Sequence, residues 1–354
     1  MTSTELTQVQ SVLLIVNRPS GTGRSAADLD DLRQAFETYF AGLPRREFHV
    51  TEGHVSVLRL TREFLRATPG PYCLLAGGGG GTTRALVNGL LTECAPGAPG
   101  LEAVRVGVLR LGSGNLIAKR LGMPADPLAG LRVLAEGLVA GRVQPGWAYR
   151  CTFHLPDGGQ WLEHGLALGS LGQFAHVPAE VERWKQSHLG LVRWATRFVP
   201  LEAITNIQYG LFSLGRAADV VLRPGQAEWI EVRQAGHSER LRLLAGVLLK
   251  FELPQIPVRA SCQFGAPRLT LGLLPLDSRR QLLGALWHWR DLDGRMRKYA
   301  ITPEAPLEMR YLGPETATVA LDEDTITTAA QRLTWEVVGP LNFIPGWAVS
   351  QAAQ

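Results

Sequence analysis

The sequence predicts an α/β N-terminal domain with a parallel sheet, followed by a C-terminal, mostly antiparallel β-sandwich domain. Three observations predict this. Strand-like and helix-like segments alternate up to about Pro145. After it, short turn-bounded runs rich in Val, Leu, Thr and Trp dominate. The length of 354 residues also exceeds one typical core. We therefore expect domains at residues 1–145 and 146–340, with residues 341–354 as a tail returning to the first domain.

The first domain is expected to consist of βα units. Short apolar runs predict strands at Ser11–Val16, Glu47–Thr51, Tyr72–Ala76 and Val104–Leu109. Apolar residues at helical spacing predict helices at Asp28–Phe40, Val55–Arg66, Arg84–Leu90, Leu116–Leu121 and Pro127–Ala140. Strands that alternate with helices in this way favour a parallel sheet, whose ligands bind beyond the carboxyl ends of the strands.

The second domain is expected to be built from short strands. They are predicted at Trp147–Leu155, Trp161–Leu168, Ala217–Leu222, Glu228–Val232, Val258–Phe264, Arg268–Leu274, Glu308–Leu312, Thr316–Leu321 and Leu333–Val338. Two helical segments, Val181–Leu214 and Ser278–Asp291, interrupt them. The first carries Trp194 and Phe198, and is either an ordinary core-facing helix pair or an apolar cleft wall for an acyl chain near a membrane surface.

A run of five glycines, Gly77 to Gly81, follows the predicted strand at Tyr72–Ala76. Thr82 and Thr83 stand where the N-cap of the next helix belongs. A strand, a glycine loop and a helix N-terminus together favour phosphate binding, because backbone N–H groups and the helix dipole attract an anion. A flexible loop is the alternative. The run is neither a Walker P-loop nor a GxGxxG followed by an acid.

Two further polar turns also follow predicted strands. One begins at Asn17 and includes Ser20 and Gly21; the other runs from Gly112 through Ser113 to Asn115. Because all three turns follow the carboxyl ends of strands, we expect them to meet in one crevice.

The composition indicates a soluble, cytoplasmic protein. The net charge is +4, and the basic residues are spread along the chain, which does not favour a nucleic-acid partner. The four cysteines form no CxxC pair, the histidines show no metal-ligand spacing, and we expect no metal site of that kind. No apolar run reaches the ~18 residues that a membrane-spanning helix needs. Peripheral contact with the inner membrane face, and a homodimer, remain open.

The three turns, in this order, resemble motifs of the diacylglycerol kinase/sphingosine kinase superfamily, including its bacterial lipid kinases. The family's Asn-Pro-x-Ser-Gly is similar to the turn Asn17-Arg18-Pro19-Ser20-Gly21. Its Gly-Gly-Asp-Gly-Thr and the following Val-Asn-Gly are similar to residues 78–82 and 87–89. Its Gly-Thr-x-Asn-Asp is similar to residues 112–116, and a late Asp-Gly-Glu to residues 322–324.

The resemblance implies a nucleotide-binding α/β domain beside a lipid-binding β-sandwich, and transfer of the γ-phosphoryl group of ATP to a lipid hydroxyl. It implies that Asp322 accepts the hydroxyl proton. The interpretation of residues 181–214 as an apolar cleft wall makes Trp194 and Phe198 the candidate lipid contacts. The residues that it implies for nucleotide binding are Asn17, Ser20, Gly21, Gly78, Gly79, Gly80, Gly81, Thr82, Gly112, Ser113 and Asn115.

The chain departs from the family pattern at acidic positions. Gly80, Leu116, Ala85 and, near the start of the second domain, Leu171 stand where the family has acids. Mg²⁺ usually takes one or two carboxylates, and glycine or leucine supplies none. We therefore expect phosphate binding to survive these changes more readily than phosphoryl transfer. An inactive lipid- or nucleotide-binding regulatory homologue is the first alternative, and an NAD kinase-like enzyme is the second.

Overall fold

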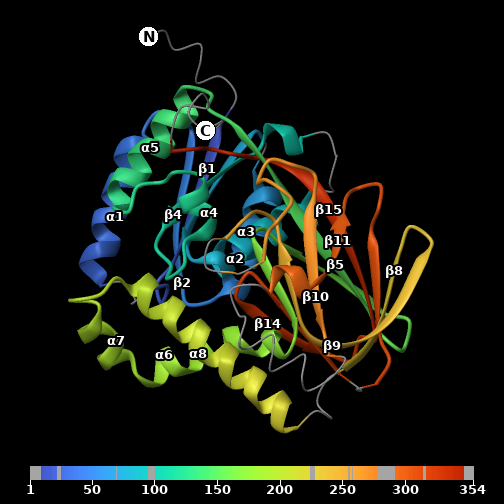
Figure 1. The fold of residues 1–354 in the computed structure, drawn as a ribbon. Coiled ribbons are helices and arrows are strands. Elements are labelled where there is room, and N and C mark those ends of the chain that lie inside the picture. Colours follow the sequence, from blue (N-terminus) through green and yellow to red (C-terminus); the bar gives the residue numbers. More distant parts are fainter. Residues whose placement is uncertain are drawn as a thin grey trace. The chain divides into compact units, whose positions relative to one another are not determined.

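The computed structural model describes residues 9–346 except 22–24, 69, 95–99, 224–227, 254–255, 257, 277–291 and 314–315. The chain divides into two compact units (Figure 1). Unit 1 comprises Met1–Gly146 and Gly339–Gln354, and unit 2 comprises Trp147–Val338. The boundaries lie within two long strands, β5 (Gln144–His154) and β15 (Arg332–Phe343).

Unit 1 contains a parallel sheet, as predicted. Its strands lie in the order β2-β1-β3-β4. The central strands are fully buried runs of aliphatic residues, typical of a sheet covered on both faces. Phe343 continues the sheet by pairing in parallel with Val106 of β4. The bounds are β1 (Ser11–Asn17), β2 (Arg45–Thr51), β3 (Tyr72–Gly78) and β4 (Arg105–Arg110).

Helices cover both faces of this sheet. Figure 1 shows α1 beside α5 on one face, with α2 and α3 on the other. Gly89 of α3 lies so close to α2 that a Cβ atom there would be 2.8 Å from Cβ of Thr61. The bounds are α1 (Ala26–Tyr39), α2 (His54–Ala67), α3 (Gly80–Glu93), α4 (Leu116–Arg120) and α5 (Pro127–Val139).

The predicted N-cap of α3 is wrong. The helix begins at Gly80, and Gly79 in an extended conformation is its N-cap. Thr82 and Thr83 lie buried in the first turn. Thr82 fits there because Gly78 has no side chain: a Cβ atom on Gly78 would lie 2.2 Å from Oγ1 of Thr82.

Unit 2 is built on antiparallel strands, as predicted. One ladder runs β14-β13-β7-β9-β8-β12-β15, β10 links β9 to β11, and β5 pairs with β6 and β15. The bounds are β5 (Gln144–His154), β6 (Gln160–Gly165), β7 (Leu168–Gly172), β8 (Glu228–Gln234), β9 (His237–Leu249), β10 (Leu269–Pro275), β11 (Arg297–Ile301), β12 (Leu307–Tyr311), β13 (Ala317–Leu321), β14 (Asp324–Thr328) and β15 (Arg332–Phe343).

Most inward-facing side chains of these strands form one large core, and Leu244, Ala245 and Leu274 belong to a smaller second cluster. Trp335 of β15 is fully buried and packs against Tyr149 of β5, with ring centroids 6.2 Å apart. Phe153 stacks on Trp161 at 4.6 Å. Side chains from β7 to β13 complete the same cluster. The apolar residues of the runs that predicted these strands therefore contribute to a shared interior.

Several predictions for unit 2 are wrong or lie outside the described residues. Ala217–Leu222 is the end of a helix, and Val258–Phe264 is irregular instead of a strand. Trp161–Leu168 is broken into β6 and the start of β7. The segment Ser278–Asp291 falls among the residues that are not described.

The helical prediction for Val181–Leu214 is confirmed, as three helices. They are α6 (Val177–Ser187), α7 (Leu189–Ala195) and α8 (Leu201–Leu222), preceded by a single 3₁₀ turn, Gln173–His176. Among the described residues, no helix is both long enough and apolar enough to span a membrane.

Candidate functional site

Three loops of unit 1 lie against one another at the carboxyl ends of β1, β3 and β4. Gly21, with φ of +71°, approaches the third loop so closely that a Cβ atom would lie 2.9 Å from the carbonyl oxygen of Leu111. A Cβ atom on Gly112 would lie 2.3 Å from Cα of Gly79. The structure thus brings together the turns that begin at Asn17, Gly78 and Gly112. Glycine is required at these contacts because two backbones meet there.

A row of three residues crosses the sheet at this edge. Gly78 of β3 pairs with Arg110 of β4, and the register of β1 places Asn17 level with Gly78. Residues in register project to the same face of a sheet, here the face of α3, where Thr82 sits above Gly78. Neighbouring strands are ~4.8 Å apart, so Asn17 and Arg110 flank the bare glycine at about that spacing.

Each of the three side chains around Gly78 has a buried polar atom without a hydrogen-bond partner. They are Oδ1 of Asn17, Oγ1 of Thr82 and Nε of Arg110. Asn17 and Thr82 are only 5% and 1% exposed. Buried polar atoms are nearly always satisfied, so three unsatisfied ones in one place indicate a site built for a polar ligand. We call Asn17, Thr82, Arg110 and the glycines 78–81 the cradle.

The N-terminus of α3 supplies the donors of the cradle. Thr83 donates its N–H to Gly79 O at 3.1 Å, so the helix's own hydrogen bonds begin there. The N–H groups of Gly80, Gly81 and Thr82 precede it, and such first-turn N–H groups have no acceptor within a helix. Together with the positive end of the helix dipole they favour an anion. The ring of His54, at the start of α2, lies against Gly81: a Cβ atom there would be 2.3 Å from its Cε1.

Two of the other predicted loop residues, Asn115 and Ser20, form hydrogen bonds within their own turns. The side chain of Asn115 closes its own turn: Gly112 N donates to Oδ1 at 2.8 Å, and Nδ2 donates to Gly112 O at 2.7 Å. Asn115 adopts the left-handed conformation, with φ of +52°. Ser20 donates its N–H to Asn17 O at 3.1 Å, and Ser113 lies within the third loop.

The donor set does not suit Mg²⁺. The cradle offers backbone N–H groups, an amide, a hydroxyl and a guanidinium, whereas Mg²⁺ takes oxygen ligands and usually carboxylates. Glu52, just after β2, has an exposed carboxylate that is ion-paired with Arg18 at 3.6 Å. Across the described parts of the chain, no group of three or more His, Cys, Asp or Glu side chains could hold a metal ion.

Asp322 lies in unit 2, in the two-residue turn between β13 and β14. Its carboxylate accepts N–H bonds from Leu166, from Ala167 at 2.8 Å and from Leu168 at 2.9 Å, and the residue is only 3% exposed. Asp322 and Glu323 both have positive φ, as hairpin turns of this length require. Asp322 therefore stabilises unit 2 by joining this turn to residues 166–168.

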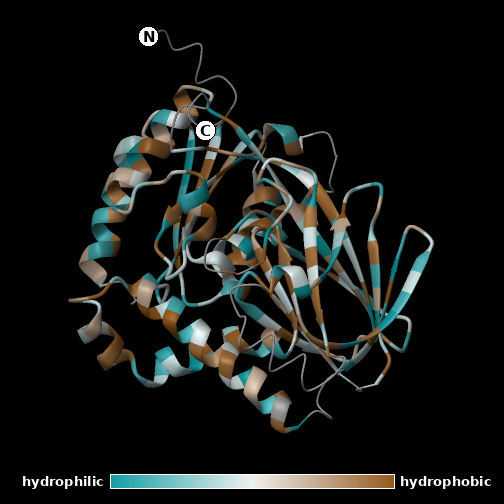
Figure 2. Ribbon diagram, in the orientation of Figure 1, coloured by the Kyte–Doolittle hydropathy of each residue, from teal (hydrophilic) through white to brown (hydrophobic). Residues whose placement is uncertain are grey.

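Trp194 and Phe198 lie on an exposed apolar surface of unit 2. Trp194 is 56% exposed and Phe198 72%, and their rings are in edge contact with centroids 5.3 Å apart. Figure 2 shows hydrophobic positions recurring along α7 and α8. We call this surface the apolar face; its exposed members are Leu191, Trp194, Phe198, Ile207, Leu211 and Leu214.

The side of α8 opposite the apolar face is buried and partly polar. Thr205 and Gln208 are buried there although their side-chain polar atoms have no hydrogen-bond partners. Between Thr205 and Leu214, α8 thus exposes aliphatic side chains and buries polar ones, which is the reverse of an ordinary amphipathic helix. Such a surface is typical of proteins that contact lipid or another apolar partner.

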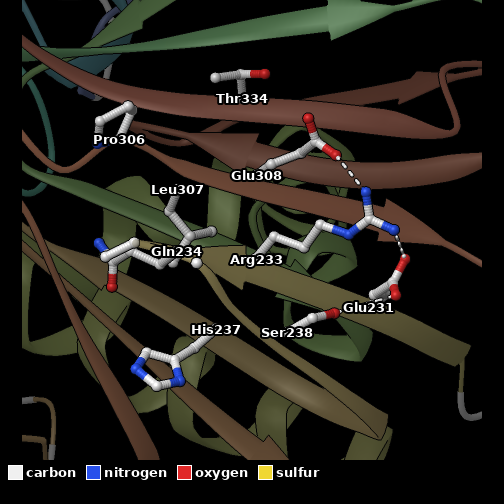
Figure 3. Close-up of a pocket in the computed structure, with 11 residues that line it drawn as sticks. Glu231, Arg233, Gln234, His237, Ser238, Pro306, Leu307, Glu308 and Thr334 are labelled. Carbon is white, nitrogen blue, oxygen red and sulfur yellow. Dashed lines mark hydrogen bonds and ion pairs between the residues drawn. The ribbon is translucent and has the colours of Figure 1, made fainter.

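A separate pocket of about 630 Å³ opens on unit 2, near the β8–β9 hairpin. Figure 3 shows Arg233 reaching between Glu308 and Glu231, at 3.9 and 2.9 Å. None of the predicted site residues lines it. Because Arg233 is already paired with two carboxylates, we expect this pocket to bind anions weakly.

Arg110 and His54 are the site residues that sequence reasoning missed. Arg110 directly follows the apolar run of β4, and a cation at the end of a buried strand could have signalled it. His54 had no comparable signal, because it reaches the glycine loop only through the packing of α2 against α3.

Comparisons with known proteins find similarity to lipid kinases. Residues 11–143 match the family model of the diacylglycerol kinase catalytic domain. A stretch of 79 residues is 40% identical to a probable lipid kinase YegS-like protein of Chromohalobacter salexigens. That match covers 22% of this chain and 23% of the relative, so it spans about a quarter of the relative's length.

Solved structures with the same fold include putative diacylglycerol kinases and an NADH kinase. A putative diacylglycerol kinase from Bacillus anthracis has a TM-score of 0.64 at 14% identity, over 96% of this chain and 98% of that one. Yeast NADH kinase in complex with NADH has a TM-score of 0.52 at 10% identity, over 98% and 87%. At such identities the likeness concerns the fold alone. With the family-model match, it confirms the resemblance drawn from the three turns.

Proposed function

Since residues 11–143 match the diacylglycerol kinase catalytic domain and the whole chain has the fold of diacylglycerol kinase-like proteins, we propose a lipid kinase-like function. The protein binds the phosphates of ATP in the cradle of unit 1 and an amphipathic lipid on unit 2. The reaction that follows is transfer of the γ-phosphoryl group to a lipid hydroxyl. The observation that carries the proposal is the set of three unsatisfied polar atoms around Gly78, at the N-terminus of α3.

The cradle supports phosphate binding through ordinary physical chemistry. Unbonded first-turn N–H groups, a helix dipole and a guanidinium all favour a negatively charged oxygen. The glycines let the ligand approach the backbone. Phosphoryl transfer depends mainly on such positioning and charge stabilisation, with little covalent work left to the protein. In this proposal Asn17 and Thr82 orient the phosphates, and Ser113 lies beside the nucleotide.

The apolar face supports lipid binding. Trp194 and Phe198 offer large, exposed rings, and α8 adds a row of aliphatic side chains at helical spacing. We place an acyl chain or the surface of a bilayer against this face, with the protein in peripheral contact with the inner membrane. Exposed Arg197, between the two elements, suits an anionic headgroup.

A second candidate function is binding without turnover. The occupied carboxylate of Asp322 and the lack of carboxylates in the cradle favour it. In this case the protein keeps its affinity for nucleotide or lipid and acts as a regulatory homologue.

The experiment that separates the two candidates is a transfer assay with γ-labelled ATP. The full chain is incubated with diacylglycerol, sphingoid and other lipid alcohols in mixed micelles, and with NAD, each with Mg²⁺, with Mn²⁺ and with EDTA. Labelled lipid is the expected product. Folded protein that binds ATP by calorimetry but labels nothing supports the regulatory function; labelling of NAD alone supports an NAD kinase-like enzyme. Absence of both binding and labelling rejects the proposal.

A further inference from the structure

The charge of a polyphosphate has to be balanced within the cradle. A nucleoside triphosphate carries several negative charges, and each must be neutralised when it leaves water. Metal-dependent sites use a cation held by carboxylates. The cradle instead contains a protein cation, Arg110, in the same row as Asn17 and Gly78.

Arg110 has no partner within the described part of the chain. Its Nε is buried and makes no hydrogen bond, and no ion pair joins its guanidinium to a carboxylate. Most neighbouring arginines of unit 1 are engaged. The pairs are Arg18 with Glu52, Arg45 with Glu47, and Arg62 and Arg66 with Glu93. A buried donor left unsatisfied costs about 1–3 kcal/mol, so a ligand that accepts from Arg110 recovers that loss.

The placement of Arg110 matches the donors of α3. Gly107 of β4 faces Leu134 of α5. Because side chains alternate between the two faces of a strand, Arg110, three positions later, is on the opposite face, that of α3. The side chain therefore starts on the side of the sheet where the first turn of α3 exposes its N–H groups. A guanidinium presents a planar fork that matches two phosphate oxygens.

We propose that the cradle binds the terminal phosphates of its ligand directly, through Arg110 and the first-turn N–H groups of α3, without a divalent cation. This inference rests on the proposed function, because it takes a nucleotide polyphosphate as the ligand. It adds how the negative charge of the phosphates is balanced: Arg110 neutralises it in place of a metal ion bound by carboxylates. Asn17 and Thr82 then complete the shell of the phosphate oxygens.

The test is calorimetric binding of ATP and of inorganic pyrophosphate to the full chain, at constant ionic strength, in EDTA and in excess Mg²⁺. Affinity in EDTA is expected to equal or exceed that in Mg²⁺, since the metal competes with Arg110 for the phosphates. Arg110→Gln is expected to lower the affinity about tenfold or more in both buffers, and Arg110→Lys to recover part of it. Arg105→Gln, at the opposite end of β4, is the matched control and should bind as the native chain does.

The outcomes separate this inference from the function on which it rests. Binding that requires Mg²⁺ overturns the inference and leaves nucleotide binding standing. No binding of either ligand in either buffer rejects the proposed function itself. If folded Arg110→Gln binds ATP and pyrophosphate with unchanged affinity, Arg110 does not contribute to phosphate binding and the inference is wrong. If that variant does not fold, the comparison of EDTA with Mg²⁺ on the native chain still decides the question.

Discussion

Asp322 shows how one carboxylate can hold a hairpin turn and a neighbouring loop together. Because it accepts three backbone N–H bonds in a buried place, Asp322→Asn is expected to lower the free energy of unfolding by about 2 kcal/mol in urea titrations. Asp157→Asn is the control, because that exposed carboxylate accepts a single N–H bond, from Gly159, at 2.8 Å. Unchanged stability combined with lost lipid phosphorylation would instead make Asp322 the proton acceptor.

Glu228 makes the stability of unit 2 depend on pH. Burial raises the pKa of its carboxyl group to about 7, and its Oε2 has no hydrogen-bond partner among the described residues. Between the unfolded pKa of 4.5 and about 7, the folded chain therefore holds a proton that the unfolded chain has lost. The contribution of Glu228 to stability consequently falls as the pH rises through this window.

The corresponding variant is Glu228→Gln. It is expected to raise the free energy of unfolding by about 1–3 kcal/mol at pH 8, and to change it little at pH ~3.5, where the carboxyl group is mostly protonated in both the folded and the unfolded chain. Urea unfolding at the two pH values measures this. Glu136→Gln, at an exposed position on α5, should show no such difference. A gain of equal size at both pH values would contradict the role of ionisation.

At single positions, the sequence predicted the glycines better than their partners. Gly21, Gly78 and Gly112 stand where another backbone or side chain approaches closely, and glycine in a polar turn signals such an approach. Arg110 and His54 could not be assigned in the same way, because their relation to the loops depends on sheet register and on helix packing. Neither sheet register nor helix packing can be inferred from a local sequence pattern.

Contact of the apolar face with lipid can be tested by changing side chains at the end of α7 and in the segment before α8. Replacing Trp194 and Phe198 together by serine is expected to reduce co-sedimentation with anionic phospholipid vesicles about tenfold or more, because two large rings no longer enter the interface. Urea unfolding should change little, since both side chains are largely exposed. Trp229→Ser, an exposed tryptophan on β8, is the control. Equal vesicle binding by the double variant would exclude the apolar face as the contact.

Elements with a clear local sequence pattern were predictable, and elements whose secondary structure depends on contacts with the rest of the chain were not. The strands β1, β3 and β4 are buried, mostly aliphatic runs, and their predicted positions hold within a few residues. Ala217–Leu222 looked like a strand because Val220 and Val221 favour β structure, yet it continues α8. The strand β9 was missed because its apolar run, of which residues 243–249 are buried, fits a buried helix as well as a buried strand.

Unit 1 is discontinuous in sequence, and this sets a prediction for the whole chain. Leu341, Phe343 and Ile344 are buried, Ile344 N donates to Val106 O at 2.9 Å, and Gly346 N donates to Leu121 O at 2.6 Å. A chain ending at Val338 should lose about 5 kcal/mol of stability in unit 1, comparable to the whole stability of many domains, and with it the thermal shift caused by ATP. A chain ending at Gly346 keeps these contacts. Thermal unfolding with and without ATP compares the two; an unchanged ATP shift in the shorter chain would contradict the prediction.

At the scale of the whole molecule, fold class was easier to predict than activity. Alternation of strands and helices, followed by strands alone, is a coarse pattern that many residues share. The chemistry depends instead on a few side chains, and in this chain the cradle combines intact glycines with the guanidinium of Arg110 and no carboxylate. A fold can keep its binding loops while the charges within them change.

The pairing of Phe343 with Val106 also has a consequence for how the protein is made. A ribosome synthesises β1 to β4 first and the last segment of the sheet at the very end. Until then, β4 is an open edge with unpaired backbone groups, and such edges invite pairing with other nascent chains. Slow or stalled translation within unit 2 therefore prolongs the interval in which chaperones must shield that edge.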